Sequence, residues 1–167
     1  MKILTTFLLT VLAIGASAAP RLAQQSIRTN AILPSAHFDA AESVFRVFLS
    51  ADRQSPGFTN TVFFVSYGPH DSELPSEFLT RFSRELPYVT NSLAATIKTN
   101  FTIVHSPSGR TGVGLALREL RLTGDTGEAR LVYVVSGGSF QHWRVTLKRK
   151  AQGWMVTDKT MEVIACP

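Results

Sequence analysis

The loop after the aromatic segment 61–67 holds the side chains best suited to acid/base chemistry. Tyr67, His70 and Asp71 lie close together in the sequence, and Glu73 follows them. An imidazole beside a carboxylate can move a proton to or from a substrate. The same loop could offer three metal ligands, but it has one histidine and no HExxH spacing, so we expect no metal and no cofactor. Neighbouring loop residues usually point apart, and we therefore expect these side chains to diverge into water.

His142 is the fourth candidate for acid/base chemistry, with Tyr67, His70 and Asp71. It lies on a predicted strand, on the side opposite Trp143, and it would face a pocket only if the sheet curved inward there. Exposure at a sheet edge is the simpler interpretation.

Two further motifs carry little chemistry. Gly109, Gly112 and Gly114 have the spacing of a phosphate-binding loop, but they join two predicted strands, with no helix N-terminus to hold an anion. Ser76 and Ser139 have no GxSxG elbow around them, so a hydrolase triad is not indicated.

Basic side chains gather near the C-terminus, within a predicted hairpin. They could form a stripe that binds a partner, although a solvated face that protects an edge strand is the simpler interpretation. The residues are Arg144, Lys148, Arg149, Lys150 and Lys159. The whole chain has a net charge of +5, which also favours attraction to anionic surfaces or polymers.

The N-terminus has the three parts of a secretory signal peptide. Lys2 supplies the charge, residues 3–14 form an apolar run, and Ala16 and Ala18 occupy the small-residue positions before a cleavage site. The apolar run is shorter than the roughly 20 residues of a spanning helix, so we expect no membrane span. The protein is predicted to be soluble and to act in the periplasm or outside the cell, where a nucleic-acid partner is not expected.

The sequence predicts one folded domain after this signal. We expect a signal peptide over residues 1–18, a flexible leader over 19–36 and a single domain over 37–167. Cys166 is the only cysteine, so an intramolecular disulfide is impossible; it is a tail thiol or the link of a covalent homodimer.

The first half of the domain reads as helix, strand, helix. Residues 39–51 repeat apolar side chains at helical spacing after a start that is similar to a capping box. Residues 61–67 are typical of a buried strand, and residues 75–86 form a second amphipathic helix that begins at Pro75.

The second half reads as strands. Residues 93–105 and 111–122 form a pair, with a bulge near Glu119 where the inward face switches, and residues 128–136 are apolar on both faces. A hairpin at Gly137 and Gly138 and two more strands follow. These elements predict an α+β fold with two helices packed on a curved, mainly antiparallel sheet of about five to six strands.

Three segments resemble stretches of small exported bacterial proteins of unknown function. They are Pro75–Phe82 (PSEFLTRF), Gly114–Ala129 (GLALRELRLTGDTGEA) and Gly153–Ile164, and Leu122 departs from that group, which often has tryptophan there. The resemblance implies no activity. The order of elements is also similar to the cone-shaped folds of nuclear transport factor 2 and ketosteroid isomerase and to cystatin-like rolls, which host enzymes, binders and inert modules alike.

The sequence is compatible with three functions. The first is a non-enzymatic domain that binds a small ligand or an envelope protein through the concave side of its sheet. The second is a small isomerase or hydrolase that uses the acid/base candidates. The third is an interaction or inhibitor module that uses the basic hairpin.

Overall fold

The structure is a computed structural model in which five stretches of the chain are described: 32–53, 61–83, 88–99, 102–135 and 137–165. The predicted signal peptide and its cleavage site lie outside these residues, as does Cys166. Among the described residues, no helix has the length and apolar character needed to cross a membrane.

The described helices are η1 (Ser35–His37), α1 (Phe38–Arg53), α2 (Ser76–Leu79), η3 (Thr80–Phe82) and η4 (Ser92–Ala94). The strands are β1 (Val62–Tyr67), β2 (Val89–Asn91), β3 (Ala95–Ile97), β4 (Ile103–His105), β5 (Thr111–Thr123), β6 (Thr126–Val134), β7 (Phe140–Lys150) and β8 (Gly153–Ala165). The predicted α+β class is confirmed: two helical segments pack on a mixed, mostly antiparallel sheet.

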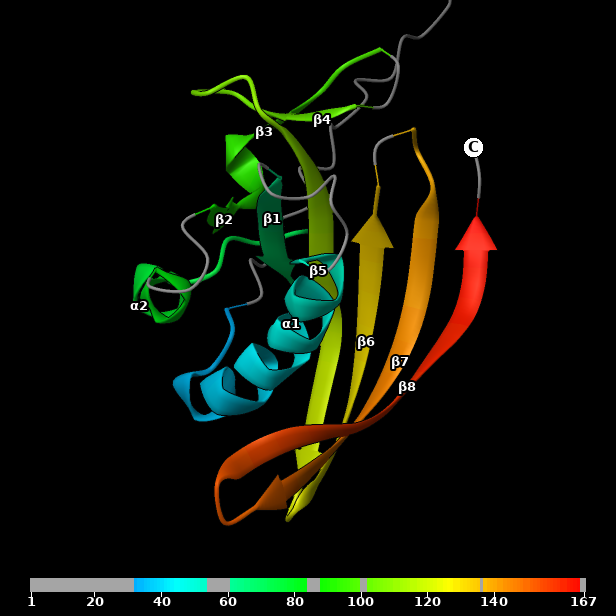
Figure 1. The fold of residues 1–167 in the computed structure, drawn as a ribbon. Helices are drawn as coiled ribbons and strands as arrows, with labels where there is room; N and C mark the ends of the chain where they lie inside the picture. Colours follow the sequence, from blue (N-terminus) through cyan, green and yellow to red (C-terminus); the bar gives the residue numbers. More distant parts are fainter. Residues whose placement is uncertain (1–31, 54–60, 84–87, 100–101, 136, 166–167) are drawn as a thin grey trace, which may run out of the picture.

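The main path of the sheet runs in the order β2-β1-β5-β6-β7-β8. β1 pairs in parallel with both β2 and β5, whereas the β5 to β8 ladders are antiparallel. A short β3–β4 hairpin joins the sheet through β4, which pairs with β5. Figure 1 shows the long strands curling around α1, with the β7–β8 hairpin passing beneath the helix. The concave side of the sheet is therefore occupied by α1.

The buried face of α1 follows the predicted helical spacing. Its apolar side chains recur every three or four residues and are buried at Phe38, Ala41, Val44, Phe45, Phe48 and Leu49. The helix begins at Phe38, after η1, so Asp39 lies in the first turn rather than at the cap. From there its carboxylate accepts a 2.7 Å hydrogen bond from Arg81, which ties α1 to η3.

Aromatic rings hold the second helical segment against α1. Phe78 lies 5.2 Å from Phe38, 6.0 Å from Phe45 and 5.5 Å from Phe82, measured between ring centroids. Phe78 and Phe82 are fully buried. Edge-to-face contacts of this kind add to the free energy gained from burial, so this short segment is fixed by packing rather than by its own helical propensity.

Several sequence expectations are confirmed in detail. The β5–β6 register shifts between Leu117 and Glu119, which places the bulge where the inward face was predicted to switch. β6 lies between two neighbours, as its two apolar faces require. Gly137 and Gly138 both have positive φ, and the backbone N–H of Val135 donates a 3.1 Å hydrogen bond to the carbonyl oxygen of Ser139 across the hairpin.

Two expectations differ from the structure. The run 93–105 is not one strand: η4, β3 and β4 divide it, and β3 folds back onto β4. The alternation of side chains in this run resembles a single strand, but the alternation does not show where the chain reverses. The packed part of the domain also begins before His37, because Leu33 is buried in the main core.

Candidate functional site

The two faces of β1 have different surroundings. Phe63 and Val65 belong to the main core beneath α1, and Tyr67 packs against that core. Val62 and Phe64 point to the opposite face, where they form a small second cluster with Ile103. Because side chains alternate along a strand, Ser66 also lies on this second face. No helix comparable to α1 covers this face among the described residues, and here the structure has its candidate site.

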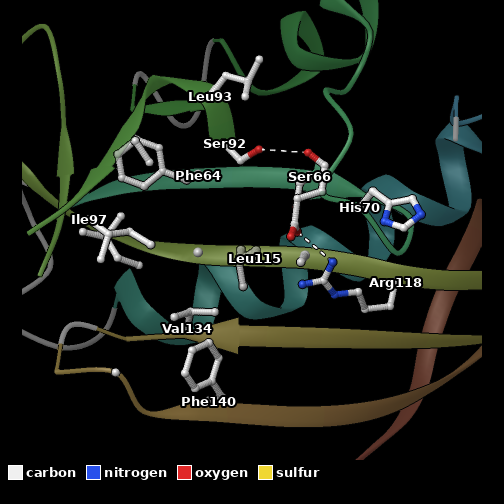
Figure 2. Close-up of a pocket in the computed structure, with 16 residues that line it drawn as sticks. Phe64, Ser66, His70, Ser92, Leu93, Ile97, Leu115, Arg118, Val134 and Phe140 are labelled. Atoms are coloured by element: carbon white, nitrogen blue, oxygen red, sulfur yellow. Dashed lines mark hydrogen bonds and ion pairs between the residues drawn. The ribbon is translucent and has the colours of Figure 1, made fainter. Parts of the chain in front are cut away.

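A cavity of about 400 Å³ lies on this second face, beside η4 and the β3–β4 hairpin. Its floor has only small side chains in the middle of β5, where Gly114 and Ala116 lie. A Cβ built at Gly114 would lie 3.4 Å from Val134, which is ordinary van der Waals contact, so a methyl group would fit there without a clash. Figure 2 shows the apolar walls around it, formed by Phe64, Leu93, Ile97, Val134 and Phe140. Ile103 also lines the cavity.

The rim of the cavity exposes large apolar side chains to solvent. Leu93 is 74% exposed, Ile97 is 68% exposed and Phe140 is 38% exposed. They come from η4, β3 and β7, yet all three line the same cavity. Apolar side chains gathered in this way are typical of binding surfaces, whereas single exposed ones need no explanation.

A polar cluster closes one end of this apolar cavity. The turn from Gly68 to Asp71 is held by two hydrogen bonds between the backbones of Tyr67 and Ser72, 3.0 and 2.9 Å long. Asp71 has a φ of 54°, a left-handed conformation that aspartate tolerates better than most residues. The Ser66 hydroxyl donates a 2.8 Å hydrogen bond to Oδ1 of Asp71.

Arg118 reaches the same carboxylate from β5. Its Nη1 lies 2.9 Å from Oδ1 of Asp71 and donates to the carbonyl oxygens of Gly68 and Pro69, at 3.1 and 3.3 Å. Arg118 has no register partner at the β5 bulge, and its side chain lines the cavity on the same face as Gly114 and Ala116. The parallel β1–β5 pairing, which ends at Tyr67 and Leu117, and the left-handed turn thus bring two opposite charges together at the end of the cavity.

The structure separates the four acid/base candidates. His70 and Asp71 line the cavity, but Tyr67 lies on the α1 side of β1, where burial, and secondly the charge of Glu119, raise its pKa above the usual value. His142 lies on β7 opposite Val132 and does not line the cavity. Our expectation that the loop residues diverge does not describe Asp71, whose carboxylate turns back to Ser66 and Arg118.

These groups do not form a nucleophilic triad. A triad needs a histidine between the hydroxyl and the carboxylate, so that the imidazole removes the hydroxyl proton. Here Ser66 donates directly to Asp71, and the His70 imidazole makes no hydrogen bond with either residue. Among the described residues, no cluster of three or more His, Cys, Asp or Glu side chains could hold a metal ion. The arrangement can bind a polar group through Arg118 and Ser66.

The basic residues do not form one stripe. Arg144, Lys148 and Lys150 alternate along one face of β7, and Arg144 makes ion pairs with Glu128 at 3.5 Å and with Glu162. Arg149 and Lys159 lie on the other face. The Lys159 ammonium rests over the rings of Phe48 and Trp143, 5.2 and 5.6 Å from their centroids. Because side chains alternate along a strand, basic residues that are close in the sequence lie on two opposite faces of the sheet.

The glycine motif has a structural role at one position. Gly109 belongs to the β4–β5 turn, with φ of 68°, and no helix follows it. At Gly112 a Cβ would lie 2.3 Å from the carbonyl oxygen of Val62, so glycine is needed for the close approach of β1 and β5. A second hollow of about 400 Å³ lies nearby, but its polar groups bind one another: Arg110 stacks 4.5 Å over Tyr88.

Sequence reasoning missed Ser66, Arg118 and the apolar rim. The alternation of β5 before the bulge was the one available signal for Arg118, because it places this residue on the same face as Gly114 and Ala116. The residues of the rim come together only through the fold of η4, β3 and β7, and no local pattern joins them.

No protein-family model, no curated protein and no solved structure matches this chain.

Proposed function

We propose that this chain is a non-enzymatic binding protein that holds a small, mainly apolar molecule in the cavity on the second face of its sheet. The observation that carries the proposal is the open space above Gly114 and Ala116, walled by large apolar side chains that are exposed at the rim. Its volume of about 400 Å³ falls within the range of small-molecule sites. This site replaces the concave side that we expected from the sequence, because α1 fills that side.

A binding role is supported over catalysis by the contacts of the polar groups. Asp71 is engaged by Ser66 and Arg118, and His70 is exposed and has no carboxylate partner among the residues that the structure describes. A general base needs a free acceptor within reach of a substrate proton, and a nucleophile needs a base beside it. Neither requirement is met by the hydrogen bonds of the cluster.

The neutral fluorophore N-phenylnaphthylamine tests the proposal, because its emission rises in apolar surroundings. We expect the wild-type protein to enhance its fluorescence in a saturable way. Gly114→Leu should abolish this binding, since the added side chain projects from the floor of the cavity. Ile97→Ser should weaken it without affecting folding, because Ile97 is largely exposed.

Thr146→Leu is the matched control for the filled cavity. Thr146 is exposed on the same face of the sheet, on β7, but outside the cavity. This variant should bind the fluorophore as the wild type does. Absence of saturable binding by the folded wild type, or equal binding by Gly114→Leu, would contradict the proposal.

We also propose that the protein acts after export, in the periplasm or outside the cell. The charge of Lys2, the apolar run 3–14 and the small residues Ala16 and Ala18 support this location. The intact mass of the exported protein should correspond to a chain that begins at Ala19. A secreted or periplasmic form that keeps Met1 would contradict the cleavage site.

A further inference from the structure

We infer that the molecule bound in the cavity carries a carboxylate, and that Arg118 recognises it through its Nε and Nη2 groups. The inference rests on the proposed function, because it names the chemical class of the ligand at the same site. It begins with the contacts of Arg118, which lines the cavity at the end formed by the turn 68–71.

Only one nitrogen of Arg118 is used within the described part of the chain. Nη1 makes the contacts to Asp71, Gly68 and Pro69, and neither Nε nor Nη2 donates a hydrogen bond to a described residue. A guanidinium has five N–H donors in a planar fork, so three of them remain for a ligand. Figure 2 shows the guanidinium directed from its stem toward the apolar part of the cavity.

The turn holds this guanidinium in a fixed orientation. Asp71 is itself anchored, because Ser66 donates to its carboxylate and Ser92 donates a 3.3 Å hydrogen bond to its carbonyl oxygen. A fork that is already oriented loses less conformational entropy when it binds a planar acceptor with two oxygens. A carboxylate matches this geometry, since it accepts two parallel hydrogen bonds.

The charges of the cluster favour a single negative charge on the ligand. Asp71 offsets part of the charge of Arg118, which keeps the empty cavity from holding an unpaired cation. A second carboxylate can share Arg118, but a cationic ligand would leave the unused donors of Arg118 facing a like charge. The rest of the ligand must be apolar, because Gly114, Val134 and Phe140 continue the cavity away from Arg118.

Calorimetric titration with decanoate, decanol and decyltrimethylammonium, each below its micelle concentration, tests the inference. The three compounds share one apolar chain and differ in the charge of the head group. We expect decanoate to bind about tenfold more tightly than decanol, the lower end for a hydrogen bond to a charged group at a partly exposed site. Decyltrimethylammonium should bind more weakly than decanol.

Three variants separate recognition by Arg118 from its support of the turn. Arg118→Gln should remove the preference for decanoate over decanol, because it removes the charged donors that a carboxylate would accept from. Arg118→Lys should keep part of the preference, because it supplies a point charge without the fork. Asp71→Asn should raise the affinity for decanoate, since it removes the competing charge and asparagine also tolerates the left-handed conformation. A purely structural role predicts that Asp71→Asn weakens all three compounds alike.

Arg130→Gln is the control, because Arg130 is exposed on the same face of the sheet but outside the cavity. It should leave the order of affinities unchanged. Equal binding of decanoate and decanol by the wild type would overturn the inference and leave the proposed cavity standing. If no compound with a decyl chain binds to the folded protein, the proposed function fails with it.

Discussion

Replacement of Gly112 by alanine should destabilise the fold strongly, although the change adds one methyl group. The new Cβ would lie 2.3 Å from the carbonyl oxygen of Val62 and 2.4 Å from Cε2 of Phe64. The phenyl ring could turn away, but the carbonyl belongs to the paired backbone of β1. β1 and β5 would have to separate where they pair in parallel. Overpacking of this kind costs about 1–3 kcal/mol, and we expect the upper end because backbone must move.

Gly114→Ala is the matched control for this prediction. Gly114 lies two residues further along β5, on the same face, and its added Cβ meets only Val134 and Ile103 side chains, at 3.4 Å or more. Alanine also lowers the conformational entropy of the unfolded chain, which stabilises the fold by about 0.4–1 kcal/mol where there is no clash. The two variants should therefore differ by about 2–4 kcal/mol in the free energy of unfolding.

Urea titration, followed by circular dichroism and by tryptophan fluorescence, measures this difference. Trp143 and Trp154 pack against the main core, away from both glycines, so their fluorescence reports global unfolding. The slope of the free energy against urea concentration should be the same in the two variants if both unfold in one cooperative step. Equal stability of Gly112→Ala and Gly114→Ala would refute the close approach of β1 and β5, and with it the assigned register.

Three further predictions concern the core, the hairpin and Tyr67. Phe78→Ala should lower the free energy of unfolding by about 3–5 kcal/mol, because it removes a fully buried ring that three others contact; a loss below about 1 kcal/mol in urea titration would contradict the aromatic cluster. Gly137→Val should cost about 1 kcal/mol or more through backbone strain alone, since φ is 96° and no atom lies within 4 Å of the added Cβ; an unchanged melting temperature would contradict this. Tyr67 should ionise above pH 10.0 in spectrophotometric titration, because its pKa is raised in the folded state. The neutral phenol therefore contributes its full stabilisation of the fold below the pKa of the unfolded chain, and this stabilisation is lost as the pH rises through the pKa of the folded protein. Tyr67→Phe should remove that phase, and its persistence would contradict the assignment.

Local patterns in the sequence predicted the α1 side of the molecule well. The helical spacing of Phe38 to Leu49 and the alternation of Ala129, Leu131 and Tyr133 on β6 both follow from burial in the main core, and burial selects residue type directly. The bulge in β5 was visible for the same reason, because Leu117 and Leu120 must both face the core. Where one face of a strand is buried and the other is exposed, the order of apolar residues predicts which side chains face the core and where a bulge lies.

The parallel pairing of β1 and the β3–β4 hairpin were harder to predict. A strand that is buried on both faces, as β1 is, has no alternation that indicates its neighbours or their direction. β3 and β4 are each three residues long, too short for periodicity to mark their ends. The chain reverses between β3 and β4 within one run that resembles a single strand, so the sequence did not predict the reversal. The wall of the cavity that this hairpin forms was therefore not predicted either.

The site depends on two local irregularities that meet only in the folded chain. Arg118 lies at the bulge of β5, where it has no register partner on β6, and Asp71 leaves the right-handed backbone at the end of its turn. Either feature alone has an ordinary explanation, since bulges and left-handed aspartates are common in sheets and turns. Their side chains come within 2.9 Å because Tyr67 and Leu117 are register partners in the parallel β1–β5 pair. The pairing that the sequence did not indicate is therefore the same pairing that assembles the polar end of the cavity, and a shift of one residue in it would separate Arg118 from Asp71.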